Sequence, residues 1–325
     1  MICRVHGYET RLLKPEKLQE LMSSSALNQF IEGLSGTAYE HYISGSKTLD
    51  EIERGLAEAL VDRLAALLSL AEGGARSFLK AYLGKYETIN LAWILRMKIG
   101  ESAGEELEMI LLPTEKLGGM ELKPLLEARD LQALRDAIQR SGMYELSKDA
   151  DDPLQLEADL WRSHYRRVFK LASRIRISDN REVRGFLGLE VDLANLKTCM
   201  LALLRGWDPE KVKQLLIFNP AGIPLKKLRE AIEEGDPKVL VERFRRFKGF
   251  LEKALASDEW ALEFEGLRIM KRYADSQRIS KFISFFYILK YILELEVEYR
   301  NLRAIAVAIH HNLPQSLRRS LLITA

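Results

Sequence analysis

The sequence predicts an all-α protein built from three homologous helical domains of about 105 residues each. Apolar residues recur at helical spacing along segments poor in Pro and Gly, and no sustained apolar–polar alternation indicates a strand. A motif consisting of an acid, two further residues and Asn-Leu occurs three times. Its asparagines lie 105 and 106 residues apart, a longer period than the roughly 20–50 residues of common solenoid repeats.

The six motif residues are Glu87, Asn90, Asp192, Asn195, Glu298 and Asn301. On a helix, an acid and an Asn three positions apart share one face. An Asn inside an apolar helix needs hydrogen-bond partners, because a buried unpaired amide costs roughly 1–3 kcal/mol. We therefore expect each Asn to tie its helix to a neighbour within its own domain. A catalytic role for three quasi-equivalent sites is the less favoured alternative.

The repeat extends beyond this motif and sets the domain bounds. An apolar–Glu pair opens a long helix upstream of each motif, as Ile52-Glu53, Leu156-Glu157 and Leu262-Glu263, at separations of 104 and 106 residues. Loops rich in Pro and Gly, around 113–119 and 220–224, mark the seams. We place the domains at about 1–114, 115–222 and 223–325.

Local signals predict where two of the upstream helices begin. Thr48 or Asp50 can start the helix near residue 50, whose apolar face is Leu56, Leu60, Leu64 and Leu67. Asp151, Asp152 and Pro153 can start the helix near residue 153, because acids and Pro suit a first turn.

Three equivalent units joined head to tail meet through heterologous contacts, which close into a ring or continue as an open array. Closure around a pseudo-threefold axis would leave a central cavity or funnel, and an open arch is the alternative. The sequence leaves both arrangements open.

Composition favours a soluble globular protein: 47% of residues are hydrophobic and 30% are charged, with a formal net charge of +2. This balance indicates no nucleic-acid partner. Phe244 and Phe247, which lie among basic residues, are interpreted as the apolar side of an amphipathic helix. The distant Cys3 and Cys199 suggest a reducing compartment.

The sequence contains no pattern of a membrane-spanning or secreted segment. Residues 1–6 lack a signal-peptide pattern. The apolar run 282–289 is ended by Lys290, well short of the roughly 20 residues that a membrane span requires. We expect a cytoplasmic protein with no transmembrane segment, which contacts a membrane only through a partner.

No group of residues predicts catalytic, cofactor or metal chemistry. The one acidic cluster that suggests a metal is Asp149, Asp151, Asp152 and Glu157, but its spacing is wrong for two ligands repeated on one helix face. Helix-capping acids are the favoured interpretation; an all-α, Mg²⁺-dependent enzyme acting on a diphosphate is the alternative. No zinc-binding spacing, P-loop or dinucleotide fingerprint is present. We therefore expect no enzyme activity and no cofactor.

The repeated segments resemble a known family. Segments 86–100, 189–198 and 296–303, with the opening Leu12-Leu13 and segment 34–39, are similar to the central-stalk connector of the vacuolar/archaeal-type rotary ATPases. This connector is known as the C subunit in prokaryotes and the d subunit in eukaryotes. The chain departs from a regular repeat at Ala92, where the later repeats have Lys197 and Arg303. In repeat two, Leu201 stands in place of Arg96.

The resemblance implies a non-catalytic rotor subunit of a V-type ATPase or A-type ATP synthase, with the active sites in other subunits. Its three-domain funnel would receive the tip of the soluble central stalk and sit, as one copy per complex, on the cytoplasmic side of the membrane ring of ion-carrying subunits. It would transmit torque for ATP synthesis or ATP-driven ion transport, with the membrane stator as a further contact. The alternative is an all-α scaffold or adaptor that binds other proteins in a concave surface.

Overall fold

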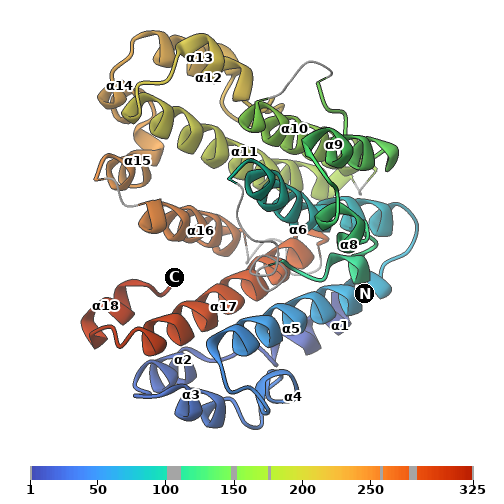
Figure 1. Ribbon diagram of the computed structural model, residues 1–325, viewed down its shortest axis with the longest axis vertical. Coiled ribbons are helices and arrows are strands. Elements are labelled where there is room, and N and C mark those ends of the chain that lie inside the picture. Colours follow the sequence, from blue (N-terminus) through green and yellow to red (C-terminus); the bar gives the residue numbers. More distant parts are fainter. Residues whose placement is uncertain are drawn as a thin grey trace.

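The fold is all-α in the part of the chain that the structure describes, as the sequence predicts. The structure is a computed structural model that describes residues 2–100, 111–147, 152–174, 177–256, 259–277 and 284–323. Every regular element in these ranges is a helix (Figure 1). None of these helices combines the length and apolar character needed to cross a membrane.

Six long helices carry the repeated sequence features. Three contain the asparagine motifs and are called the Asn helices: α6 (Gly73–Gly100), α11 (Ile177–Leu204) and α17 (Phe286–His310). Three contain the apolar–Glu pairs and are called the Glu helices: α5 (Leu49–Ser69), α10 (Pro153–Ala172) and α16 (Glu259–Ser276).

Short helices connect the long ones. They are α1 (Ile2–Glu9), α2 (Pro15–Met22), α3 (Leu27–Gly33), α4 (Glu40–Ile43), η1 (Thr114–Leu117), α8 (Leu122–Leu126), α9 (Leu131–Arg140), α12 (Pro209–Leu215), α13 (Leu225–Glu233), α14 (Pro237–Arg243), η2 (Arg245–Phe247), α15 (Lys248–Leu255) and α18 (Gln315–Ser320).

The two predicted helix starts are confirmed. Thr48 is the N-cap of α5 and forms a reciprocal capping box with Glu51, which satisfies two backbone N–H groups that would otherwise lack partners. Asp152 caps α10 by accepting a hydrogen bond from the Leu154 N–H at 3.0 Å, with Pro153 in the first turn.

Each Asn helix packs against the Glu helix of the following repeat. Helix α6 lies on α10, and α11 contacts α16. The last Asn helix, α17, has no following repeat and packs instead on α5 from the first one, so these two helices, far apart in the sequence, lie side by side (Figure 1). The same type of pairing therefore occurs three times, and the third instance joins the first and last thirds of the sequence. The domain bounds given above stay a prediction.

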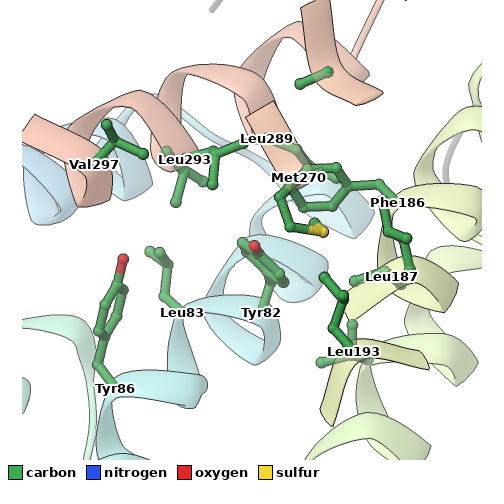
Figure 2. Packing of buried hydrophobic residues seen from close by; sticks show 14 of the residues in the cluster. Tyr82, Leu83, Tyr86, Phe186, Leu187, Leu193, Met270, Leu289, Leu293 and Val297 are labelled. Atoms are coloured by element: carbon green, nitrogen blue, oxygen red, sulfur yellow. The ribbon is translucent and has the colours of Figure 1, made fainter. Parts of the chain in front are cut away.

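The hydrophobic cores follow this arrangement. The first halves of the three Asn helices share one central core, in which Tyr82, Leu187 and Leu293 are buried (Figure 2). Farther along, Leu302 and Ile305 of α17 pack in a separate core with helices α2 to α5. The end of α6 packs likewise with α8, α9 and α10.

One predicted helix is different in the structure. Phe244 and Phe247 are both buried, but they do not lie on a single helix. Helix α14 ends at Arg243, and the chain continues through the 3₁₀ turn η2. The turn still directs both rings into the core, so the apolar interpretation of the aromatic residues holds although the helical period does not.

Candidate functional site

The three asparagines make the same contact in each repeat. The side-chain amide of Asn195 donates to the Ile217 carbonyl at 2.8 Å and accepts from the Ile217 N–H at 2.8 Å. Asn90 bonds Leu112 in both directions, at 2.7 and 3.1 Å, and Asn301 bonds Ile323 at 3.2 and 2.8 Å. Each partner lies 22 residues after its Asn. The asparagines thus fasten the chain that returns after each Asn helix, which is the structural role that the sequence predicts.

The motif acids of the first two repeats accept a hydrogen bond from a second point on the returning chain. Glu87 accepts from the Met120 N–H at 2.5 Å, and Asp192 accepts from the Ile223 N–H at 2.7 Å. Glycine precedes both donors because the backbone passes very close to the carboxylate. A Cβ added at Gly119 would lie 2.9 Å from Glu87 Oε1, and one added at Gly222 would lie closer still to the carboxylate of Asp192.

In the third repeat the donor comes from the opposite end of the chain. Glu298 accepts from the backbone N–H of Leu13, which takes the place that Met120 and Ile223 have in the other repeats. The same carboxylate accepts from the Tyr39 hydroxyl at 2.7 Å and from the Arg63 guanidinium at 2.7 Å. The first 63 residues therefore supply all three of these hydrogen bonds to the last motif acid.

An ion pair accompanies each packing of an Asn helix on a Glu helix. Arg303 pairs with Glu53 at 2.6 Å, and Lys197 pairs with Glu263 at 3.3 Å. Repeat one has Ala92 at the corresponding position, and there Arg96, one turn farther along α6, pairs with Glu157 at 2.7 Å. The departure from the repeat at Ala92 is thus compensated within the same helix.

The Asn helices meet through a buried charged cluster formed by Lys85, Glu190 and Glu296, which we call the axial triad. These residues lie five positions before the three asparagines and so occupy equivalent places in the repeats. Lys85 Nζ is 2.6 Å from Glu296 Oε2 and 3.7 Å from Glu190 Oε1. Arg300 extends the cluster, 3.6 Å from Glu296 and 3.1 Å from Glu263.

Burial and charge together set the ionisation of the triad. Burial is the largest single influence and favours the neutral forms, but the surrounding charges and hydrogen bonds together outweigh it. Glu296 and its neighbours raise the pKa of Lys85, and Lys85 with Arg300 lowers the pKa of Glu296. The pKa of Glu190 is raised, because burial outweighs the more distant Lys85 and Glu296 repels a second negative charge. The pair Lys85–Glu296 is therefore charged, while Glu190 holds a proton more readily than an exposed carboxyl does.

His164 of α10 is fully buried, and its pKa is lowered to about 3 by burial and by the positive charges of Arg167 and Lys85. It is therefore neutral at pH 7. Neither of its ring nitrogens has a hydrogen-bond partner among the described residues. It packs edge-on against the rings of Trp161 and Tyr165, which indicates a core histidine and not a general base.

Asp149 and Asp151, two acids of the cluster that suggests a metal, lie outside the described residues. Of the other two acids in the cluster, Asp152 caps α10 and pairs with Lys211 at 2.6 Å, and Glu157 pairs with Arg96. In the described ranges, no three His, Cys, Asp or Glu side chains are placed to hold a metal ion.

Sequence reasoning found the asparagines but missed the axial triad and the role of the N-terminal segment. The triad had a signal in the same period, since residues 85, 190 and 296 keep the 105 and 106 spacing of the motif. Its residue types differ between repeats, with Lys in the first repeat and Glu in the other two, so a search for identical residues does not find it. The contact between Leu13 and Glu298 has no signal in sequence spacing.

The described part of the chain is thus built from three repeats of one helical pattern, joined through a buried charged centre. The family model for the ATP synthase (C/AC39) subunit matches residues 1–321, and the chain belongs to this family. The resemblance drawn from the repeated segments is thereby confirmed.

Curated relatives agree over nearly the whole chain. The chain is 25% identical over 323 residues to the C subunit of the A-type ATP synthase of Desulfurococcus sp. (strain SY), covering 95% of this chain and 85% of that protein. It is 23% identical over 321 residues to the protein of the same name from Thermococcus kodakarensis, covering 94% and 85%. The protein of that name from Archaeoglobus fulgidus is 24% identical over 350 residues, covering 99% and 95%.

Proposed function

We propose that this protein is a non-catalytic rotor subunit of a V/A-type ATPase or ATP synthase. It joins the soluble central stalk to the membrane ring of ion-carrying subunits and transmits torque between them. The observation that carries the proposal is the family match along residues 1–321, together with relatives named as the C subunit of A-type ATP synthases.

The packing of the repeats supports a mechanical role. A part that transmits torque must resist shear between its domains, and close-packed helical cores have low compressibility. The three Asn helices share a central core, and the Lys85–Glu296 pair joins the first of them to the last across 211 residues of sequence. Ion pairs also hold each Asn helix to the Glu helix on which it packs.

The proposal includes an arrangement in space and a set of partners. The three domains, at about 1–114, 115–222 and 223–325, surround a pseudo-threefold axis as a funnel that receives the stalk. One copy lies at the cytoplasmic face of the membrane, bound through the stalk subunits and the membrane ring, with the membrane stator as a further contact. Support for a closed arrangement comes from the third helix pairing, between α17 and α5, which repeats the other two.

The test is an affinity purification of the tagged chain from detergent-solubilised membranes of the source organism, with quantitative mass spectrometry. Recovery of stalk subunits and ring, with one copy of this chain per complex, is the expected result. Recovery of soluble proteins without the ring would refute the rotor assignment and favour the scaffold alternative. As a control for folding, the recovered chain should show the helical circular dichroism of the purified protein.

A further inference from the structure

A groove on the middle repeat has features that the threefold pattern does not require. It has a volume of about 1310 Å³ and lies between α10, helix α12 and the chain that leads into α13. Its apolar lining includes Phe169, Leu216 and Phe218. Leu216 and Phe169 connect the floor of the groove to the central core, whereas Phe218 lies outside that core.

Phe218 is the most conspicuous residue of this groove. Its side chain is 68% exposed, more than that of any other large hydrophobic residue in the described ranges. It directly follows Ile217, the partner of Asn195, and the corresponding residues of the other repeats are Pro113 and Thr324. An aromatic residue at this position is therefore not a feature of the repeat. An exposed aromatic ring on an apolar groove is typical of a contact site.

The charged residues that line the groove are mainly basic. Five cations line it, Arg162, Arg166, Lys211, Lys213 and Arg229, against two acids, Asp152 and Glu210. By contrast, the whole chain of 325 residues has a formal net charge of only +2. Positive charge is thus concentrated around this apolar surface.

Two of the five cations, Arg166 and Arg229, have at most an exposed, exchangeable partner and can bind an external acid. Lys211 and Lys213 are paired with Asp152 and Glu210, which themselves line the groove, and Arg162 is held by Asp159. Arg229 has no ion-pair or hydrogen-bond partner among the described residues. Arg166 pairs only with Glu145, and both side chains are well exposed, so this pair is weak and exchangeable.

We infer that this groove is a docking site for an acidic amphipathic helix of another protein in the same complex. An apolar groove between helices accepts the apolar face of another helix, with anchor residues at i, i+3 or i+4, and i+7. Carboxylates flanking that face would meet Arg166 and Arg229. A membrane surface is less favoured, because a lipid-binding helix lays an exposed apolar face into the membrane interface, whereas these residues line a groove.

The inference rests on the proposed function only for the identity of the complex that holds the partner. The test replaces Phe218 with the photo-crosslinking residue p-benzoyl-L-phenylalanine in the full chain, within the complex purified from membranes. The same replacement at Leu317, which is 52% exposed on α18, is the matched control. After irradiation, the crosslinked peptides are sequenced by mass spectrometry.

The expected product at position 218 is an adduct with a helical segment of another protein of the complex in which Asp and Glu outnumber Lys and Arg. Adding Arg229→Glu should lower its yield about fivefold, the upper range for one exposed ion pair. The control Lys248→Glu, at an exposed site on α15, should leave the yield unchanged. No adduct at 218, or an adduct only with lipid, a second copy of this chain or a basic segment, would overturn the inference.

The two proposals can fail separately. If the purified complex lacks the membrane ring, the rotor assignment fails, but the crosslink at position 218 still reports whether an acidic helix occupies the groove. If the ring is recovered and position 218 yields no acidic helix, the docking inference fails and the rotor assignment stands.

Discussion

The reciprocal hydrogen bonds of the three asparagines should make them among the most sensitive positions of the chain. Replacing Asn195 with Ala removes both bonds to Ile217 and leaves a buried N–H and a buried carbonyl without partners. Each unsatisfied group costs roughly 1–3 kcal/mol, so the free energy of unfolding should fall by roughly 2–6 kcal/mol. Protein stabilities are roughly 5–15 kcal/mol, so this is a large fraction of the total.

The assay is urea unfolding followed by circular dichroism, on Asn90→Ala, Asn195→Ala and Asn301→Ala. The matched control is Asn28→Ala, because Asn28 is exposed and makes no side-chain hydrogen bond to the described residues. We expect all three core variants to lose much more stability than the control. If they lose no more than Asn28→Ala does, the argument that these amides hold the returning segments is wrong.

Three further predictions concern buried ionisable residues, two in the axial triad and one at His164. Lys85→Met leaves the buried Glu296 without its closest partner and should destabilise the chain by roughly 3–5 kcal/mol in urea unfolding; a neutral result would show that the pair is dispensable. Glu190 has a raised pKa in the fold, so its ionisation disfavours folding as the pH rises above 4.5. Glu190→Gln should therefore gain stability relative to wild type between pH 4.5 and 7. A difference in the free energy of unfolding that stays constant over this range would contradict the prediction. His164 has its pKa lowered from 6.5 to about 3, so the unfolded chain binds a proton first as the pH falls below 6.5, and folding is increasingly disfavoured down to about pH 3. At pH 5 the resulting loss in the free energy of unfolding is roughly 2 kcal/mol. In His164→Gln this loss should be missing when thermal unfolding is followed against pH. If the stability of the variant changes with pH as steeply as that of wild type, His164 is not the cause.

The sequence allowed the helices and the structural role of the asparagines to be predicted, because both depend on local spacing and on the cost of burying a polar group. Leu56, Leu60, Leu64 and Leu67 are buried on one face of α5, as their spacing predicted. The partner of each Asn could not be predicted, because it depends on how the chain returns after the helix.

Contacts between repeats were harder to predict than contacts within them. Lys85 and Glu296 are 211 residues apart, and only the fold shows that their equivalent positions face one another. The turn at Phe244 was missed for a related reason. Its apolar spacing fits a helix, but α14 ends at Arg243 and both rings are buried from the 3₁₀ turn that follows, so tertiary packing and not local propensity decides the backbone here.

The contact between Leu13 and Glu298 also affects how the chain folds during synthesis. The two residues are 285 positions apart, so the first helices emerge from the ribosome long before the helix that completes their core. At roughly 5–20 residues per second, this delay is roughly 15–60 s. During that time the apolar side chains of α2 to α5 that later cover α17 have no partner, and exposed surface of this kind promotes aggregation. The N-terminal fifth of the newly made chain is therefore the part that most needs a chaperone, and truncation anywhere before α17 leaves it permanently incomplete.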